Sequence, residues 1–220
     1  MTTSRRTTAS LLTGLAIAVS ACGAGEASED LSEAGAPAAD AAASDGAQVA
    51  ALREVAERYR DVDAALEAGY VRDPSNMCVT AEMEGMDPSL GAMGIHYFRP
   101  DLLGIVQTEP RVAGTGTHTD FSQPSVLIYE PQADGSLELV AIENVVFQSG
   151  WEAAGHTSPP SFMGNEYVHM VDDPASAPDE AHGFEPHYEL HAWVVRDNPN
   201  GMFAPHNPNV TCEHQGRAGD

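Results

Sequence analysis

Lysine is absent from the 220-residue sequence, so all ten of its Lys or Arg residues are arginine. The sequence also contains 33 Asp and Glu residues, so the formal net charge is −23 at pH 7. Such a balance argues against electrostatic binding of nucleic acid or anionic lipid. It favours cationic ligands, metal ions among them, although the commoner meaning of an acidic surface is solubility.

A long apolar run is also missing at the N-terminus. The stretch LLTGLAIAV (11–19) falls well short of the ~20 residues that a membrane-spanning helix needs. It follows Arg5 and Arg6 and ends at the small residues SAC, which predicts a secretory signal peptide over residues 1–21. VSAC resembles the bacterial lipobox, which implies that Cys22 is lipidated and anchors the protein in the cell envelope, outside the cytoplasmic membrane. Whether export follows the Sec or the twin-arginine route stays open.

Large side chains are nearly absent from residues 22–46, which are mostly Ala, Gly, Ser, Asp and Glu. This composition cannot offset the entropy cost of ordering, so the segment is predicted to be a disordered acidic tether. Residues 47–220 have the size of one domain with a core of its own.

Cysteine is scarce as well. If Cys22 is lipidated, Cys78 and Cys212 remain, and an even pair in an oxidising compartment predicts a disulfide. The alternative is a pair of cysteine metal ligands, but no CxxC motif accompanies them.

The domain begins with a helical pattern and continues with strand patterns. Apolar residues recur at steps of three and four over residues 47–70, with Asp45 and Gln48 as a capping box, which predicts one amphipathic helix. Strands are predicted at 93–98, 125–130, 137–147, 165–171 and 187–195, the second and third forming a hairpin around Asp134-Gly135. The predicted fold is therefore α+β, with the helix packed on an antiparallel sheet or an open β-barrel.

Common catalytic signatures are missing too. There is no GxSxG elbow, no HExxH motif, no P-loop and no Gly-rich dinucleotide fingerprint after a strand, so catalytic residues stay unassigned.

What the sequence does contain is a strand with ionisable groups on one face. In HYELHAWVV (187–195), His187, Glu189, His191 and Trp193 alternate with apolar residues and predict a polar face or a cavity lining. Such a face is solvated, internally paired or ligand-binding.

Two further residues extend this set. Glu143 stands alone in the apolar run LVAIENVVF, where an unpaired carboxylate costs several kcal/mol to bury. His96 follows glycine-punctuated turns in GIHYF. His96, Glu143, His187, Glu189 and His191 thus form a candidate site for one divalent metal ion, with His187 at its rim and Tyr97 and Trp193 lining the cavity. Zn, Cu, Mn and Fe are not distinguishable from this ligand set.

Alternative interpretations stay open. A carboxylate at Glu143 needs no metal ion if it lies at an exposed edge of the sheet or pairs with an arginine such as Arg99 or Arg196. The methionines ahead of His96 allow a Cu(I) site or ordinary core packing; they are Met77, Met83, Met86 and Met93.

Three blocks of the sequence resemble a family of uncharacterised bacterial secreted proteins and lipoproteins. They are GMGIHYF, VLIYEPQADGSLELVAIENVV and HYELHAWVVRDNPNGMFAPHNPNVTC. Asn144 departs from the family pattern, in which an aromatic residue usually follows the Glu. The resemblance implies one exported domain and a paired Cys212, and it implies no reaction.

Two hypotheses follow. One is an exported, lipid-anchored domain that binds a divalent metal or a small ligand. The other is a non-catalytic envelope or surface module whose polar strand face is solvated. A buried Glu143 with His96 and His191 converging on it favours the first, and dispersed outward side chains favour the second.

Overall fold

The amphipathic helix predicted at residues 47–70 is two helices, α1 (Ala36–Glu57) and α2 (Val62–Glu67). The break occurs because the Asp61 side chain accepts a hydrogen bond from the Asp63 backbone N–H at 3.0 Å and so starts a new helix. The single-helix prediction, with its capping box at Asp45, is therefore wrong.

These helices belong to a computed structural model that describes residues 36–216. The signal peptide and Cys22 lie outside the described residues. Part of the segment predicted as a disordered tether lies within them, and α1 begins there, at Ala36. The run APAADAAA is rich in alanine, the strongest helix former, which favours a helix start at this point. Within residues 36–216, no helix is both long and apolar enough to cross a membrane.

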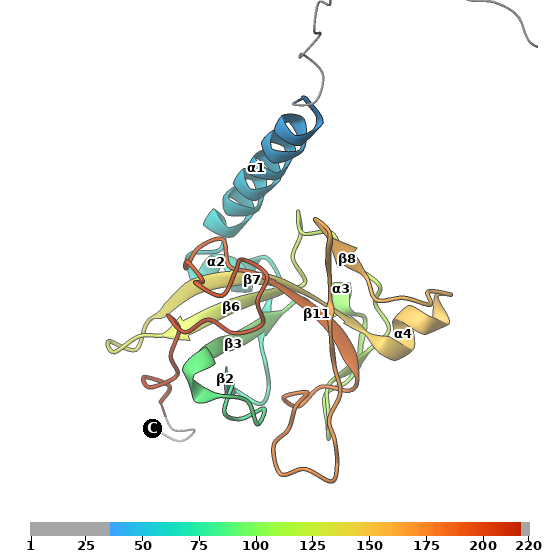
Figure 1. Cartoon of the computed structure of the whole chain (residues 1–220). Helices are drawn as coiled ribbons and strands as arrows, with labels where there is room; N and C mark the ends of the chain where they lie inside the picture. Colours follow the sequence, from blue (N-terminus) through green and yellow to red (C-terminus); the bar gives the residue numbers. More distant parts are fainter. Residues whose placement is uncertain (1–35, 217–220) are drawn as a thin grey trace, which may run out of the picture. The chain divides into compact units, whose positions relative to one another are not determined.

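The central element is an antiparallel sheet of seven strands that does not close into a barrel. Its strands run in the order β1-β3-β6-β7-β11-β10, and β2 also pairs with β3 (Figure 1). They span β1 Val71–Arg72, β2 Cys78–Thr80, β3 Ala92–Phe98, β6 Val126–Pro131, β7 Leu137–Phe147, β10 Val168–Met170 and β11 His187–Ala192. The predicted α+β class is confirmed, with a helix-covered sheet as its form.

Shorter elements connect these strands. They are η1 Pro88–Leu90, α3 Pro100–Leu103, α4 Gln148–Ala153 and the paired strands β4 Ile105–Gln107, β5 Ala113–Gly114, β8 Ser161–Phe162 and β9 Asn165–Glu166. The hairpin of β6 and β7 forms as predicted: Gly135 has a φ of 85°, and Ser136 N donates to Asp134 Oδ1 at 3.0 Å.

The sheet has two buried faces. The first packs Leu52, Val55 and Ala56 of α1 against side chains such as Tyr129 and Leu190. Two tyrosine hydroxyls tie this side together, since Tyr129 donates to the Tyr59 carbonyl and Tyr70 to the Pro124 carbonyl, both at 2.6 Å. The C-terminal part of α1 and the helix α2 therefore pack on this face of the sheet.

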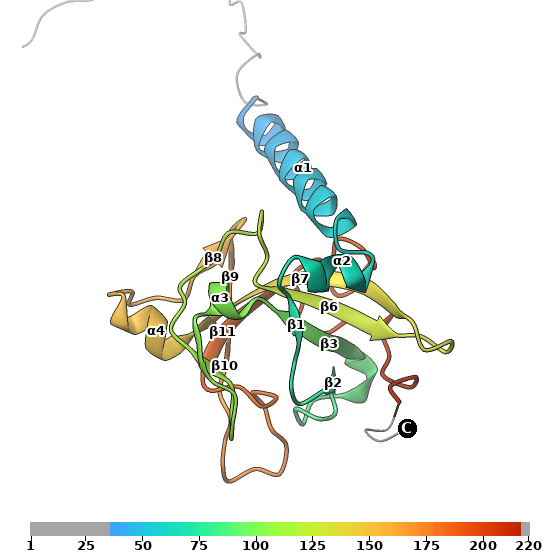
Figure 2. The same cartoon turned by 180° about the vertical axis from the view of Figure 1, so that it is seen from behind.

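Connecting segments and the short helix α3 cover the second face. Leu103, Val112, Phe184 and Val210 pack there against strand residues such as Val126 and Phe147. The segment between β10 and β11, which carries Phe184, is a long loop beyond the ends of these strands (Figure 2). This loop-covered face holds the ionisable residues.

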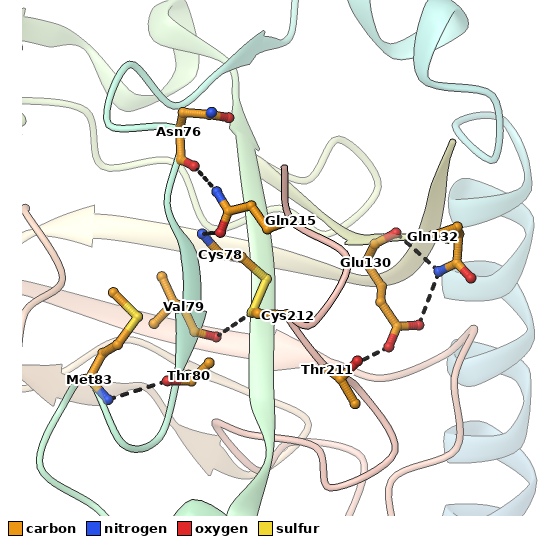
Figure 3. Close-up of a disulfide and its surroundings, with 10 residues drawn as sticks. All are labelled: Asn76, Cys78, Val79, Thr80, Met83, Glu130, Gln132, Thr211, Cys212 and Gln215. Carbon is orange, nitrogen blue, oxygen red and sulfur yellow. Dashed lines mark hydrogen bonds between the residues drawn. A yellow bond between two sulfur atoms is a disulfide. The ribbon is translucent and has the colours of Figure 1, made fainter. Parts of the chain in front are cut away.

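The predicted disulfide is confirmed. Cys78 on β2 is bonded to Cys212, with Cα atoms 5.7 Å apart and a sequence separation of 134. Gln215 strengthens this link, because its amide accepts a bond from Cys78 N at 2.9 Å and donates to the Asn76 carbonyl (Figure 3). Closing so long a loop stabilises the fold by on the order of 4–5 kcal/mol in the chain-entropy model.

Candidate metal centre

The loop-covered face of the sheet carries a buried row of ionisable side chains. On β11, His187, Glu189 and His191 alternate with Tyr188 and Leu190, which point to the helix-covered face. The exposed fractions of the three ionisable residues are 0%, 0% and 1%. These groups are therefore not a solvated strand face.

Glu143 and His96 join this row from neighbouring strands. Glu143 on β7 lies directly opposite His191. Its Oε1 is 3.8 Å from Nε2 of His191, and its Oε2 is 3.6 Å from Nε2 of His96 on β3. Each of the three offers a ligand atom within 4.8 Å of the other two, and all three are buried. We call these residues the Glu143 group.

A second set surrounds Glu189. Its Oε2 lies 3.2 Å from Nε2 of His182 and 3.3 Å from Nε2 of His187. Each of these three buried residues also offers a ligand atom within 4.8 Å of the other two. We call them the Glu189 group. The two groups meet at Oε1 of Glu189, which is 3.8 Å from Nδ1 of His191.

Glu84 and His206 extend the network beyond the sheet. Nε2 of His206 lies 3.3 Å from one Glu84 oxygen, and the other oxygen is 3.9 Å from Nε2 of His182. Gly91 makes this approach possible, because a Cβ there would lie 2.2 Å from the backbone oxygen of Asn207. The His/Glu cluster thus comprises eight residues, none more than 4% exposed: Glu84, His96, Glu143, His182, His187, Glu189, His191 and His206.

Most polar atoms in the His/Glu cluster have no hydrogen-bond partner. They include both oxygens of Glu84 and Glu143, both ring nitrogens of His96, and Nε2 of His191. Each such group costs about 1–3 kcal/mol to bury. A cation bound between carboxylate oxygens and neutral imidazole nitrogens would offset that cost and complete their coordination.

Burial and neighbouring charges set the protonation of these groups. Burial lowers the pKa of His96 well below its usual value and that of His191 to about 4, so both rings are neutral. Burial and then the nearby Glu189 raise the pKa of Glu143 well above its usual range. Burial also acts to raise the pKa of Glu189, but the hydrogen bonds from His182 and His187 outweigh it and lower that pKa well below its usual value.

The two arginines considered as partners of Glu143 are engaged elsewhere. Arg99 pairs with Asp101 at 2.6 Å. Arg196 pairs with Glu130 and Glu138, both at 2.9 Å. The charges that face Glu143 are histidines and another carboxylate, so an arginine does not explain its burial.

Three details of the predicted site need correction or refinement. His187 is not at a rim, because Phe184 lies over its ring at a centroid distance of 5.4 Å and leaves it fully buried. Tyr97 does not line the site. Being adjacent to His96 on a strand, it points to the opposite face and packs edge-on against Tyr129. Trp193 does border the site, with its indole stacked on the His191 ring at 5.6 Å.

The methionines ahead of His96 lie in different surroundings and do not form one group. Met83 and Met86 are 39% and 37% exposed. Met93 packs in a small apolar group with Val79 and Met170. This distribution fits core and surface packing better than a thioether copper site.

Sequence reasoning missed Glu84, His182 and His206. All three lie outside the named strands, where no alternation marks a buried position. His182 has one local signal in the structure, a left-handed φ of 37° that is uncommon for a residue other than glycine.

Comparisons with known proteins add no assignment to this geometry. No family model matches the chain, and no significant match was found among curated proteins or among solved structures. Evidence for function therefore comes from the site itself.

Proposed function

We propose that this chain is an exported, lipid-anchored domain that binds a divalent metal ion at the Glu143 group. One observation carries the binding proposal: the polar atoms of His96, Glu143 and His191 converge in the buried interior, where neither oxygen of Glu143 has a hydrogen-bond partner in the protein. Two imidazoles and one carboxylate are ligands that Zn, Cu, Mn and Fe all accept.

Several features support this proposal over a solvated envelope module. The carboxylate of Glu143 is fully buried, and the side chains converge instead of dispersing. Burial of this kind, without an ion or a partner, costs several kcal/mol. Zn²⁺ binds histidine nitrogens and carboxylate oxygens at ~2.0–2.2 Å. The observed spacing of the ligand atoms in the Glu143 group requires only small movements to reach these bond lengths.

Replacing His191 by alanine should lower metal affinity by at least tenfold, because Nε2 of His191 is one of three convergent ligand atoms. The measurement is a Zn²⁺ titration of chelator-stripped protein in competition with a chromophoric chelator, with elemental analysis of the purified protein beside it. The matched control is His169→Ala, since His169 is exposed and its ring contacts Tyr188, whose side chain points to the helix-covered face. A stripped wild type that binds no Zn²⁺, Mn²⁺, Fe²⁺ or Cu²⁺ would refute the binding proposal and favour the non-catalytic module.

Lipid anchoring rests on the VSAC stretch after a short apolar run, and the Cys78–Cys212 disulfide is consistent with an extracytoplasmic location. The resemblance to bacterial secreted proteins and lipoproteins supports the same location.

Cys22→Ser should shift the protein from the membrane to the soluble fraction, because the substitution removes the acceptor of the lipid and leaves the domain unchanged. Fractionation followed by immunoblotting measures the shift, and Ser20→Ala is the control that retains the cysteine. Equal membrane association of Cys22→Ser and wild type would contradict lipidation at this residue.

A further inference from the structure

The Glu189 group has the spacing of a metal site in its own right. Oε2 of Glu189 lies 3.2 Å and 3.3 Å from the Nε2 atoms of His182 and His187. Two ligands bound at ~2.0–2.1 Å to a tetrahedral ion are about 3.3–3.4 Å apart, so little movement would be needed to enclose an ion. This spacing is closer to a tetrahedral edge than that of the Glu143 group.

The backbone fixes which nitrogen of His187 is free to bind. Nδ1 of His187 lies 3.0 Å from the carbonyl oxygen of Glu185. A carbonyl only accepts, so Nδ1 carries a proton, and Nε2 is the atom directed at Glu189 Oε2, either as donor of the hydrogen bond at 3.3 Å or as ligand of an ion between them. A lone pair facing a carboxylate is repulsive unless a proton or a cation lies between them. The arrangement of Nδ1–H on a carbonyl and Nε2 free is the one that histidine ligands commonly show.

His182 is held in place by a strained but well-supported loop. Its left-handed φ of 37° is unfavourable for a residue other than glycine and persists only where surrounding contacts impose it. Asp179 provides such a contact, accepting from the Gly183 N–H at 2.8 Å. Arg111 in turn binds Asp179 at 2.6 Å and donates to the Phe184 carbonyl at 2.8 Å. The loop thus fixes the His182 ring beside Glu189.

Glu189 connects this group to the first one. While Oε2 faces His182 and His187, Oε1 lies 3.8 Å from Nδ1 of His191. That oxygen is placed to orient the His191 ring with Nε2 toward Glu143. The two groups therefore use different atoms and do not compete for one ion.

Charge favours more than one cation. The His/Glu cluster contains three buried glutamates, Glu84, Glu143 and Glu189, and within residues 36–216 no arginine forms an ion pair with any of them. Metal binding displaces protons from its ligands, and three deprotonated carboxylates with neutral imidazoles would stay negative with a single divalent ion.

An opening also exists at this end. A pocket of about 100 Å³ is lined by His182, Gly183 and Phe184 together with Asp73 and Pro110 among others. Because His182 is only 3% exposed, an ion in this pocket reaches the buried ring nitrogens only when the loop opens.

We propose that His182, His187 and Glu189 bind a second divalent ion, so that the buried His/Glu cluster holds two. This inference rests on the proposed function, since it adds a site to the one at the Glu143 group. Glu84 and His206 lie behind His182 and complete the polar surroundings of this second ion.

The test is the number of Zn²⁺ ions retained by the full chain after stripping, reloading and exhaustive dialysis, measured by elemental analysis against protein concentration. Wild type and the His169→Ala control should retain two ions per chain. His187→Asn should retain one, because the asparagine amide replaces Nδ1–H as donor to the Glu185 carbonyl but has no counterpart of Nε2. His191→Ala should also retain one, and the double variant none. Circular dichroism establishes that each variant is folded, and His187→Gln replaces His187→Asn if the latter is not.

The outcomes separate the two proposals. One ion in wild type that His187→Asn leaves in place overturns the second site and leaves the proposed function standing. Another outcome is a wild type that holds one ion, with that ion lost in His187→Asn but kept in His191→Ala. This result would overturn the proposal of two ions and also the proposal that the Glu143 group binds one. No ion in wild type overturns metal binding altogether.

Discussion

Glu189→Gln should release the second ion entirely and weaken binding of the first by about 10–100-fold, the usual cost of losing a residue that orients a metal ligand. The first effect is expected because Oε2 of Glu189 is the carboxylate oxygen that faces both His182 and His187. The second follows from the position of Oε1 beside Nδ1 of His191. No other single substitution in the cluster touches both groups.

The measurement is a competitive Zn²⁺ titration that resolves two binding steps in wild type. Glu166→Gln is the matched control, because Glu166 is an exposed glutamate on β9. Two ions bound with wild-type affinity by Glu189→Gln would show that Glu189 neither binds nor orients, and the link between the two groups would be withdrawn.

Glu143→Leu should stabilise the stripped protein and abolish the stabilisation that a metal ion gives at the Glu143 group. In the stripped protein, leucine removes a buried carboxylate that makes no hydrogen bond, and the free energy of unfolding should rise by about 1–4 kcal/mol, as when buried charges are replaced by apolar groups of similar volume. With free Zn²⁺ at 100 times the dissociation constant, wild type should gain about 2.7 kcal/mol per site. The variant lacks the gain at this site.

Urea denaturation with and without a chelator measures both effects. Glu130→Leu is an informative control, because Glu130 is also a buried strand glutamate but accepts a hydrogen bond from Thr211 N at 2.7 Å and pairs with Arg196. Its loss should destabilise the protein under both conditions. A Glu143→Leu variant that is less stable than wild type after stripping would mean that Glu143 has a structural partner and is not a ligand held ready for an ion.

The strand-borne half of the site could be predicted from the sequence. Alternation in HYELHAWVV placed His187, Glu189 and His191 on one face, and the apolar run around Glu143 marked a carboxylate that needed a partner. The same alternation rule excludes Tyr97, whose side chain must oppose that of its neighbour His96.

The loop-borne half could not be predicted. Glu84, His182 and His206 reach the cluster only because connecting segments fold over the sheet, and neither periodicity nor spacing encodes that approach. The break between α1 and α2 was missed for a related reason. The apolar stripe continues through residues 58–61, but a local Asp61 cap prevails over it.

The loop that covers the His/Glu cluster also affects how long a bound ion would stay. Because none of the eight cluster residues is more than 4% exposed, an ion cannot leave while the domain keeps this conformation. Departure requires local opening, and the ion pairs of Arg111 with Asp172 and Asp179 oppose opening of the segment that presents His182. The residence time of a bound ion is then governed by the frequency of that opening as well as by the strength of its bonds. A protein of this design would keep its metal through long exposure to dilute surroundings, even where equilibrium favours loss.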